Sequence, residues 1–414
     1  MRLKLNSALR KAAALLAAFF FGAFILVMGT RTVVAWSAAQ TGDWTRALRL
    51  EPGNAEWRCN LGAYQTIVRN DPHAAIPYLE TGVRLNPHDA TCWTALGDSY
   101  AQAGDFANER RTLEAALRAE PNDAHIALNT ATIYVNSNEV ERALPLYQLA
   151  IQKRPDWAAQ ILRNIWFHEP NADELMAKAL PPGAAPRLAL LKLLVEKNQS
   201  SSAALVWQKI MQDNQPFESK DALFYVDALL AQGDADAAEK AWQQLASRDG
   251  DLAQRSTKGN LIANAGFERS ILNGGFDWIY TPVHGIDVSV DTAEFHSGSR
   301  ALALSFDSDN LDVSGLKQFI YVQPGSRYSF SAWVRADSIE TANGPRFAFS
   351  DPATHQAVFS SEDVLGSSPW RSISGEFSTG AGTKLLELSI VRNPAIGRIR
   401  GKIWIDDLEL VQNP

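Results

Sequence analysis

PHDATCWTALGDSYAQAGDFANERRTLEAALRAEP spans residues 87–121 and both begins and ends with a proline. A further proline, Pro155, follows Pro121 by the same 34 residues that separate Pro87 from Pro121. Proline cannot continue a helix interior, because it lacks the N–H group and clashes with the preceding turn. Prolines at a fixed interval therefore mark the ends of successive helical pairs. This half of the chain is predicted to be a stack of helix–turn–helix units.

The residues between these prolines resemble the tetratricopeptide repeat family. The unit quoted above carries the family's pattern at Trp93, Leu96, Gly97, Tyr100, Gly104, Leu113 and Ala116. The next unit repeats it at Tyr134, Ala143, Tyr147 and Ala150, and the preceding one at Leu61, Gly62, Ala75 and Leu79. The resemblance implies an all-α solenoid over residues 41–250, clearest over about 54–156, whose groove binds a protein or peptide. Beyond Pro155 the register fades, and we expect degenerate helical pairs at about 186–212 and 221–246.

The first 40 residues differ in kind from the repeats. Arg2, Lys4, Arg10 and Lys11 precede an uncharged, mostly apolar run at 12–30. Those 19 residues would span roughly 28 Å as a helix, close to the thickness of a bilayer's hydrocarbon core. The basic flank should stay in the cytoplasm. Residues 1–40 are therefore predicted to be a single-pass anchor in a bacterial inner membrane, with the bulk of the chain periplasmic or extracellular. A signal peptide cleaved near 37–39 is the alternative.

Composition narrows the class of function. The formal net charge is −7 and the charged residues are 21% of the chain, which argues against a nucleic-acid partner. No glycosidase-like carboxylate pair and no G-x-S-x-G motif is recognisable, so no enzyme is predicted. Cys59 and Cys92 fall on the first helices of adjacent repeats, whose axes lie about 9–10 Å apart. That spacing exceeds the reach of a disulfide, so both are predicted to be buried, separate thiols.

A polar stretch at 247–259 is predicted to be a linker, after which the hydrophobic period changes from helical to alternating. Residues 301–306, 327–335 and 386–390 alternate as strands of an antiparallel sandwich do. Residues 258–414 resemble galactose-binding-like jelly rolls that serve as carbohydrate-binding modules. The resemblance rests on five ordered segments: 260–268, 296–302, 322–336, Trp370 and 404–410.

The jelly-roll resemblance implies a structural calcium ion where the first and last strands meet. Glu268 would supply one carboxylate and Asp406 or Asp407 another, with carbonyl oxygens near 297–299 completing the shell. Such oxygen ligands suit calcium. The alternative is that Asp406 and Asp407 end a strand at a solvated turn.

Sugar binding needs exposed aromatic faces with polar side chains beside them. In 327–336, Tyr328, Phe330 and Val334 form one face, so Trp333 and Arg335 point from the other, which the resemblance makes the ligand-carrying face. Weaker candidates are Gln318 and Tyr321, which lie on opposite faces of the preceding strand. Packing of Trp333 beneath a loop or against the solenoid is the alternative. Trp278 and Tyr280 fit either core or cleft rim, and His284 and His296 are predicted to be surface or hydrogen-bonded residues.

Together these features predict a multidomain envelope adaptor: an N-terminal transmembrane helix, a solenoid and a jelly roll. It would hold a protein partner in the groove and a polysaccharide on the jelly roll, in cell-envelope or exopolysaccharide assembly. A pure protein–protein scaffold with a structural jelly roll is the alternative.

Overall fold

The structure is a computed structural model that describes the backbone of residues 8–255 and 259–414. Arg2 and Lys4 of the predicted basic flank lie outside these residues. The chain forms two compact units, Met1–Ala189 and Leu190–Pro414, which we describe separately. The division falls inside one helix, Ala184–Glu196, rather than at the polar stretch that was predicted to be a linker.

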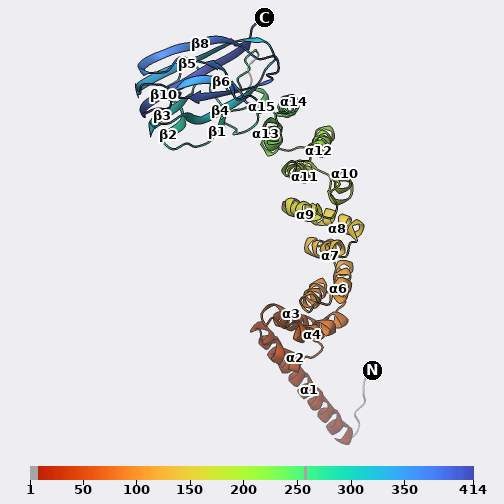
Figure 1. The fold of residues 1–414 in the computed structure, drawn as a ribbon. Helices are drawn as coiled ribbons and strands as arrows, with labels where there is room; N and C mark the ends of the chain where they lie inside the picture. The colour runs from red at the N-terminus through yellow and green to blue at the C-terminus, as the bar shows by residue number, and fades with distance from the viewer. Residues whose placement is uncertain (1–7, 256–258) are drawn as a thin grey trace. The chain divides into compact units, whose positions relative to one another are not determined.

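The N-terminal unit is helical throughout its described residues (Figure 1). Its elements are α1 (Ala8–Gln40), α2 (Trp44–Leu50), α3 (Ala55–Ile67), α4 (Pro72–Leu85), α5 (Ala90–Gln102), α6 (Phe106–Ala119), α7 (Ala124–Asn136), α8 (Val140–Lys153), η1 (Pro155–Trp157), α9 (Ala158–Ile165), α10 (Ala172–Glu174), the π-helical turn η2 (Leu175–Ala179) and the start of α11 (Ala184–Glu196). The short elements after Pro155 coincide with the loss of the sequence register.

Aspartate side chains start most of the repeat helices. The Asp89, Asp105 and Asp123 carboxylates each accept a hydrogen bond from the backbone N–H three residues on, at the first turns of α5, α6 and α7. Such caps satisfy N–H groups that have no partner inside the helix. Inside the repeats, Leu79 and Ala116 are fully buried, as the repeat pattern predicts.

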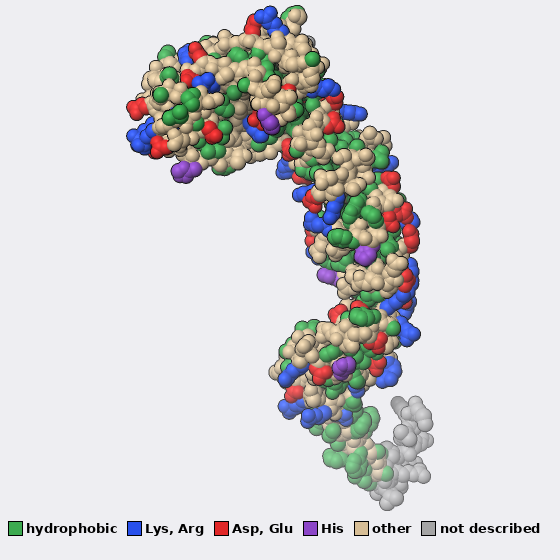
Figure 2. Space-filling view, viewed as in Figure 1, with side chains coloured by type: hydrophobic (Ala, Val, Ile, Leu, Met, Phe, Trp, Pro, Cys, Tyr) green, Lys and Arg blue, Asp and Glu red, His purple; other side chains and the backbone are tan. Residues whose placement is uncertain are grey.

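α1 is long and apolar enough to cross a membrane, with a mean hydropathy of 2.4 in its most apolar window and no buried side chain there. The surface of α1 consists mainly of its own hydrophobic side chains (Figure 2). Its last turns behave differently: Ala35 and Ala38 are buried with Ala47 of α2 and Trp57 of α3. α1 therefore continues from the apolar run into the first helical hairpin. A cleavage near 37–39 would remove part of that packing.

Cys59 and Cys92 form a disulfide between α3 and α5, so the prediction of two separate thiols is wrong. Their Cα atoms are 5.3 Å apart. The prediction used the spacing of helix axes, but Cα atoms lie about 2.3 Å off the axis, so facing Cα atoms come about 4.6 Å closer. Gly82 of α4 makes room for the bridge: a Cβ there would lie 2.5 Å from the Cys59 sulfur and 2.9 Å from the Cys92 sulfur.

The C-terminal unit joins further helices to a two-sheet sandwich. Its helices after α11 are α12 (Ser200–Asp213), η3 (Ser219–Ala222), α13 (Leu223–Ala231), α14 (Ala235–Ala246) and α15 (Gly250–Ala253). The strands are β1 (Ile279–Tyr280), β2 (Ile286–Asp291), β3 (Ala301–Asp309), β4 (Val313–Tyr321), β5 (Arg327–Glu340), β6 (Arg346–Asp351), β7 (Gln356–Ser360), β8 (Gly366–Ser378), β9 (Leu385–Val391) and β10 (Arg398–Gln412).

The ten strands pair antiparallel in two sheets. Sheet A has the order β1-β4-β9-β6-β7 and sheet B the order β2-β3-β10-β5-β8. Alternate residues of each strand fill the space between the sheets: on β5 these include Tyr328, Phe330 and Val334. Trp278 belongs to this core, and Tyr280 packs against it. The predicted all-β sandwich and the alternation of β5 are confirmed.

The described part of the segment predicted to be a linker is packed against the sandwich. α15 lies within it, and Arg255 is only 5% exposed. The Arg255 guanidinium donates to the Ser270 carbonyl (2.8 Å), the buried Asp277 carboxylate (2.9 Å) and Asp251 (2.9 Å). The sequence did not reveal this packing, because the segment has no periodic apolar pattern. It is held by one buried cation, whose partners include residues distant in sequence.

Candidate functional site

Trp333 and Arg335 of β5 lie on the outer face of sheet B, as predicted, but both are engaged by the protein. The imidazole of His296 stacks on the Trp333 indole, with ring centroids 3.8 Å apart and planes at 15°. Arg335 forms an ion pair with Glu294 and lies over the Trp404 ring at 5.0 Å. One face of Trp333 is therefore covered by a loop residue. The predicted alternative, packing beneath a loop, describes this indole in part.

A set of carboxylates on either side of the loop at 296–300 holds His296 in place. Asp406 accepts the backbone N–H groups of His296 (2.9 Å) and Ser297 (3.1 Å). Asp407 contacts the His296 ring nitrogen Nδ1 (2.6 Å) and accepts the Ser297 hydroxyl (2.7 Å). Glu268 accepts the N–H and the hydroxyl of Ser299 at 2.7 and 2.6 Å. We call Glu268, Asp406 and Asp407 the carboxylate clasp.

The clasp contains the residues predicted to bind calcium. The Asp407 N–H also donates to Asp406, at 2.8 Å. With this bond, all six carboxylate oxygens of the clasp are hydrogen-bonded, two on each residue. The groups bonded to these oxygens are N–H and O–H donors and the His296 ring, and residues 8–255 and 259–414 contain no group of three His, Cys, Asp or Glu side chains suited to a metal. These contacts form a hydrogen-bonded clasp. Calcium binding stays a prediction.

Local environment shifts the clasp's acidity in two directions. Partial burial raises the pKa of Glu268, but hydrogen bonds from Ser299 and Arg300 outweigh it, so the net pKa is lowered. Burial raises the pKa of Asp406, against the hydrogen bonds from Ser297 and His296. Gly298 lets the loop approach closely, since its φ is +66° and a Cβ there would overlap the Glu268 carboxylate.

Trp404 completes the cluster on the outer face of sheet B. Its indole N–H donates to Asp291 (2.9 Å), and the Lys402 ammonium lies over its ring at 4.5 Å. Trp370 of β8 lies beside His296, with centroids 5.7 Å apart. Three tryptophans therefore gather on this face, but Trp333 and Trp404 are covered by side chains of the same domain.

Gln318 is not available to a ligand. It is fully buried, and its side-chain amide pairs with the backbone of Ala263, accepting from the N–H (3.2 Å) and donating to the carbonyl (2.9 Å). The prediction failed because alternation made one of Gln318 and Tyr321 face inward, and a backbone partner 55 residues away satisfies the inward one. Tyr321 lies on the outer face of sheet A, away from Trp333.

The outer face of sheet A carries an aromatic pair that sequence reasoning missed in part. Phe319 stands two residues before Tyr321 on β4, so both side chains are on the same face, and both are half-buried. Within the described chain, neither ring contacts another aromatic ring. The Lys317 ammonium lies 4.8 Å from the Phe319 centroid and pairs with Glu387 of β9 at 3.0 Å. The alternation of β4 was a sufficient signal, because it places Phe319 on the same face as Tyr321.

The edge of this face meets the helices of the same unit. Asp236 of α14 accepts the Tyr321 hydroxyl at 2.8 Å and forms an ion pair with Lys384. Asp227 of α13 accepts the Gly275 N–H at 2.6 Å. The last helical pair is therefore bonded directly to sheet A and to the loop before β1.

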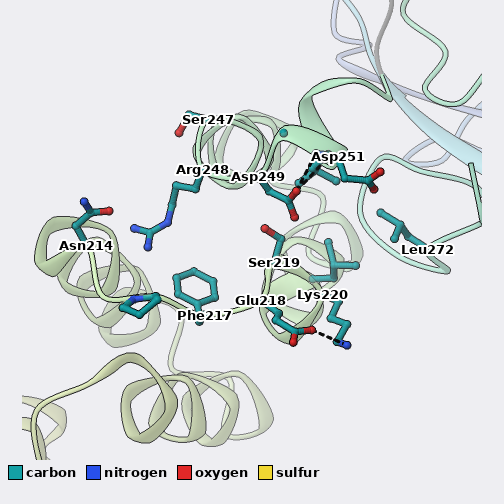
Figure 3. Close-up of a pocket in the computed structure, with 14 residues that line it drawn as sticks. Asn214, Phe217, Glu218, Ser219, Lys220, Ser247, Arg248, Asp249, Asp251 and Leu272 are labelled. Carbon is teal, nitrogen blue, oxygen red and sulfur yellow. Dashed lines mark hydrogen bonds and ion pairs between the residues drawn. The ribbon is translucent and has the colours of Figure 1, made fainter.

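A cavity of about 720 Å³ lies between the segment that follows α12, η3, the segment from Ser247 into α15, and the loop at Leu272 (Figure 3). Its charged side chains have partners within the cavity wall: Arg248 donates to the Gln215 carbonyl (2.7 Å) and lies over Phe217, and Glu218 pairs with Lys220. Asp249 caps α15. The lining carries two cations and three carboxylates, and these side chains have contacts within the protein, so the cavity indicates no particular ligand.

Comparison with known proteins identifies both domain types. The family model described as a carbohydrate binding domain matches residues 259–395, and the tetratricopeptide repeat model matches 67–113 and 110–158. The chain thus carries tetratricopeptide repeats followed by a carbohydrate-binding domain, as the sequence resemblances predicted. Both are non-catalytic domain types.

Curated relatives match over short stretches. Cellulose synthase operon protein C of Escherichia coli is 33% identical over 90 residues, which cover 18% of this chain and 8% of the relative. Human Superkiller complex protein 3 is 23% identical over 105 residues, covering 25% of this chain and 7% of the relative. The matched part is thus under a tenth of each relative's length.

Solved structures with similar parts include one described as CBM4, at 14% identity and a TM-score of 0.29, covering 37% of this chain and 99% of that one. YrrB, a tetratricopeptide protein described as having an unusual peptide-binding site, is 15% identical with a TM-score of 0.28, covering 51% and 95%.

Proposed function

We propose that this protein is a membrane-anchored envelope adaptor that binds a polysaccharide through the sandwich and a protein partner through the helical repeats. The observation that carries the polysaccharide role is the outer face of sheet A, within a domain that matches a carbohydrate-binding family model. Phe319 and Tyr321 present aromatic rings there, and Lys317, Glu387 and Ser389 supply hydrogen-bonding groups beside them. Aromatic rings can stack on the apolar faces of sugars while such groups bind hydroxyls.

Availability of the rings decides between the two sheets. His296 occupies one face of Trp333 and Arg335 is held by Glu294. On sheet A the Lys317 ammonium lies over Phe319 and Asp236 accepts the Tyr321 hydroxyl, but no aromatic side chain of the described residues stacks on either ring. We therefore place the sugar on the sheet A face, where neither ring stacks on another ring of the domain. A role for Trp333 and Arg335 in sugar contact stays a prediction and is a defined outcome of the experiment below.

Two features support an envelope location outside the cytoplasm. Disulfides persist in oxidising compartments, and Cys59 and Cys92 are bridged. α1 suits a single-pass anchor, and the burial of Ala35 and Ala38 in the first hairpin favours an uncleaved one. The similarity to a cellulose synthase operon protein favours a setting in exopolysaccharide assembly.

The test is binding of the full chain, in non-ionic detergent, to a panel of soluble and insoluble polysaccharides by affinity electrophoresis and pull-down. We expect Phe319→Ala to weaken binding about three- to tenfold, the value of one aromatic contact. Trp333→Ala is the matched control on the opposite sheet and should bind as the wild type does. Melting curves of both variants establish that they are folded.

The reverse pattern, with loss in Trp333→Ala alone, would move the site to sheet B. Failure of the wild type to bind any polysaccharide would favour a pure scaffold with a structural sandwich. One observation supports that second candidate: the tryptophans of sheet B pack against their own domain instead of facing solvent.

A further inference from the structure

A groove in the N-terminal unit runs between α5, α6 and α7. It encloses about 570 Å³, and its walls combine apolar, amide and acidic side chains. The lining includes Phe106, Leu113 and Ile133 on the apolar side and Asp98, Glu109, Asn129 and Asn136 on the polar side. Nothing in the proposed function says what chemistry this groove selects.

The two acidic side chains of the groove have no partner in the protein. Within residues 8–255 and 259–414, no hydrogen bond or ion pair reaches the carboxylate of Asp98 or Glu109. Desolvation by the groove walls raises the pKa of both groups, and the charge of Asp98 raises that of Glu109 further. Each carboxylate therefore lies where a positive charge would be favourable.

The cations nearby in sequence lie outside the groove lining: Arg111 contacts the Asn108 amide oxygen at 3.5 Å, and two others belong to an ion-pair network. Arg110, which directly follows Glu109, pairs with Glu114 (3.2 Å) and with both oxygens of Glu139. Arg142 joins the same network through Glu139 at 2.9 Å and lies over the Tyr134 ring. This network leaves the groove itself with negative charge only among its lining residues.

The rest of the lining suits an extended peptide. Phe106, at the start of α6, is 68% exposed, although it is a large apolar side chain beside the groove. Asn129 and Asn136 lie seven residues apart and so share one face of α7. In the described residues neither side-chain amide makes a hydrogen bond, so both remain able to pair with a peptide backbone.

We propose that this groove binds an extended segment of a partner protein in which a lysine or arginine stands beside an apolar residue. The cation would lie between Asp98 and Glu109, and the apolar side chain would cover Phe106. Charge complementarity carries the choice of occupant, since the groove offers two unpaired carboxylates and no cation. The inference rests on the proposed partner-binding role of the repeats and adds its charge selectivity.

The test uses fluorescein-labelled Gly-Ser-Lys-Leu-Lys-Ser-Gly and the matched peptides with glutamate or glutamine in place of lysine. Anisotropy is measured with the full chain in non-ionic detergent micelles. We expect the lysine peptide to bind best and to weaken as salt rises from about 0.05 M to about 0.5 M. The variant Asp98→Asn/Glu109→Gln should lose about fivefold or more in affinity for it. Glu56→Gln, an exposed acid on α3, is the control and should leave affinity unchanged.

Because neither carboxylate has a partner, the double variant should melt no lower than the wild type, which separates a binding defect from misfolding. Equal binding of the lysine and glutamate peptides, or full affinity in the double variant, would overturn the charge selectivity while leaving a peptide-binding role. Absence of binding by all three peptides would count against the partner-binding role itself.

Discussion

The Cys59–Cys92 bridge should set the stability of the first repeats, and its removal is the sharpest test of the structure. The bridge joins residues 33 apart in sequence. In the loop-entropy model, closing a loop of that size in the unfolded chain is worth about 4 kcal/mol, between about 3 for 15 residues and about 4.7 for 100. We therefore expect Cys59→Ala/Cys92→Ala to destabilise α3–α5 by about 4 kcal/mol, before any adjustment for packing.

Gly82 turns this expectation into a double-mutant cycle. Gly82→Ala places a methyl group against both sulfur atoms, so with the bridge intact it should cost about 1–3 kcal/mol through overpacking. With alanine at 59 and 92 the sulfurs are gone, and the same change should cost much less. The two effects should therefore fail to add, because the three residues share one contact.

Hydrogen exchange followed by mass spectrometry is the appropriate assay, since a chain with two compact units does not unfold in one step. Exchange in α3–α5 should speed up by about a thousandfold without the bridge, as about 4 kcal/mol requires. Peptides from the sandwich should be unchanged. Additive effects of the cysteine and Gly82 changes, or two free thiols in protein isolated under denaturing, non-reducing conditions, would refute the reasoning.

Three further outcomes are expected. An alkaline phosphatase reporter fused after Pro414 should be active, because that enzyme needs an oxidising compartment; activity of a cytoplasmic reporter there would reverse the assigned topology. The melting temperature of the sandwich should not respond to EDTA or millimolar calcium if the clasp works through hydrogen bonds, whereas a rise with calcium would restore the ion predicted from the sequence. Asp291 has a lowered pKa, mainly through the Trp404 N–H and the Ala293 N–H. Its stabilising effect should be present above its unfolded pKa of about 3.8 and be lost as pH falls through its folded pKa, so Asp291→Asn should flatten that part of an acid-unfolding curve.

Local patterns predicted most of the architecture. The interval from Pro87 to Pro121 and the spacing of Trp93, Leu96 and Gly97 depend on neighbours within one hairpin, so sequence alone located the repeats. Alternation in 327–335 likewise placed Trp333 on the outer face of its strand. Each of these signals is a periodic spacing of residues along the chain. Such a spacing can be recognised without knowing which distant segments pack against it.

The failures share a different cause. Gln318 was assigned to a binding face, but its partner is the backbone of Ala263 in a segment that precedes the strands. His296 was predicted to be a surface or hydrogen-bonded residue and is bonded to Asp407, but its stacking on Trp333 from a loop was not predicted. Arg255 lay in the expected linker and is buried against Asp277. Each depends on one contact between distant segments, which no periodicity records.

The continuity of α1 has a mechanical consequence. Its 33 residues include both the apolar run and the buried alanines of the first hairpin, with no glycine or proline between Thr30 and Gln40 to act as a joint. A tilt or rotation of the helix in the bilayer would therefore move the first hairpin with it, because the connection is a continuous helix. A flexible tether would not transmit such a motion. Inserting a short glycine–serine segment after Thr30 would uncouple the two, and would show whether the adaptor only holds its partners near the membrane or also conveys movement to them.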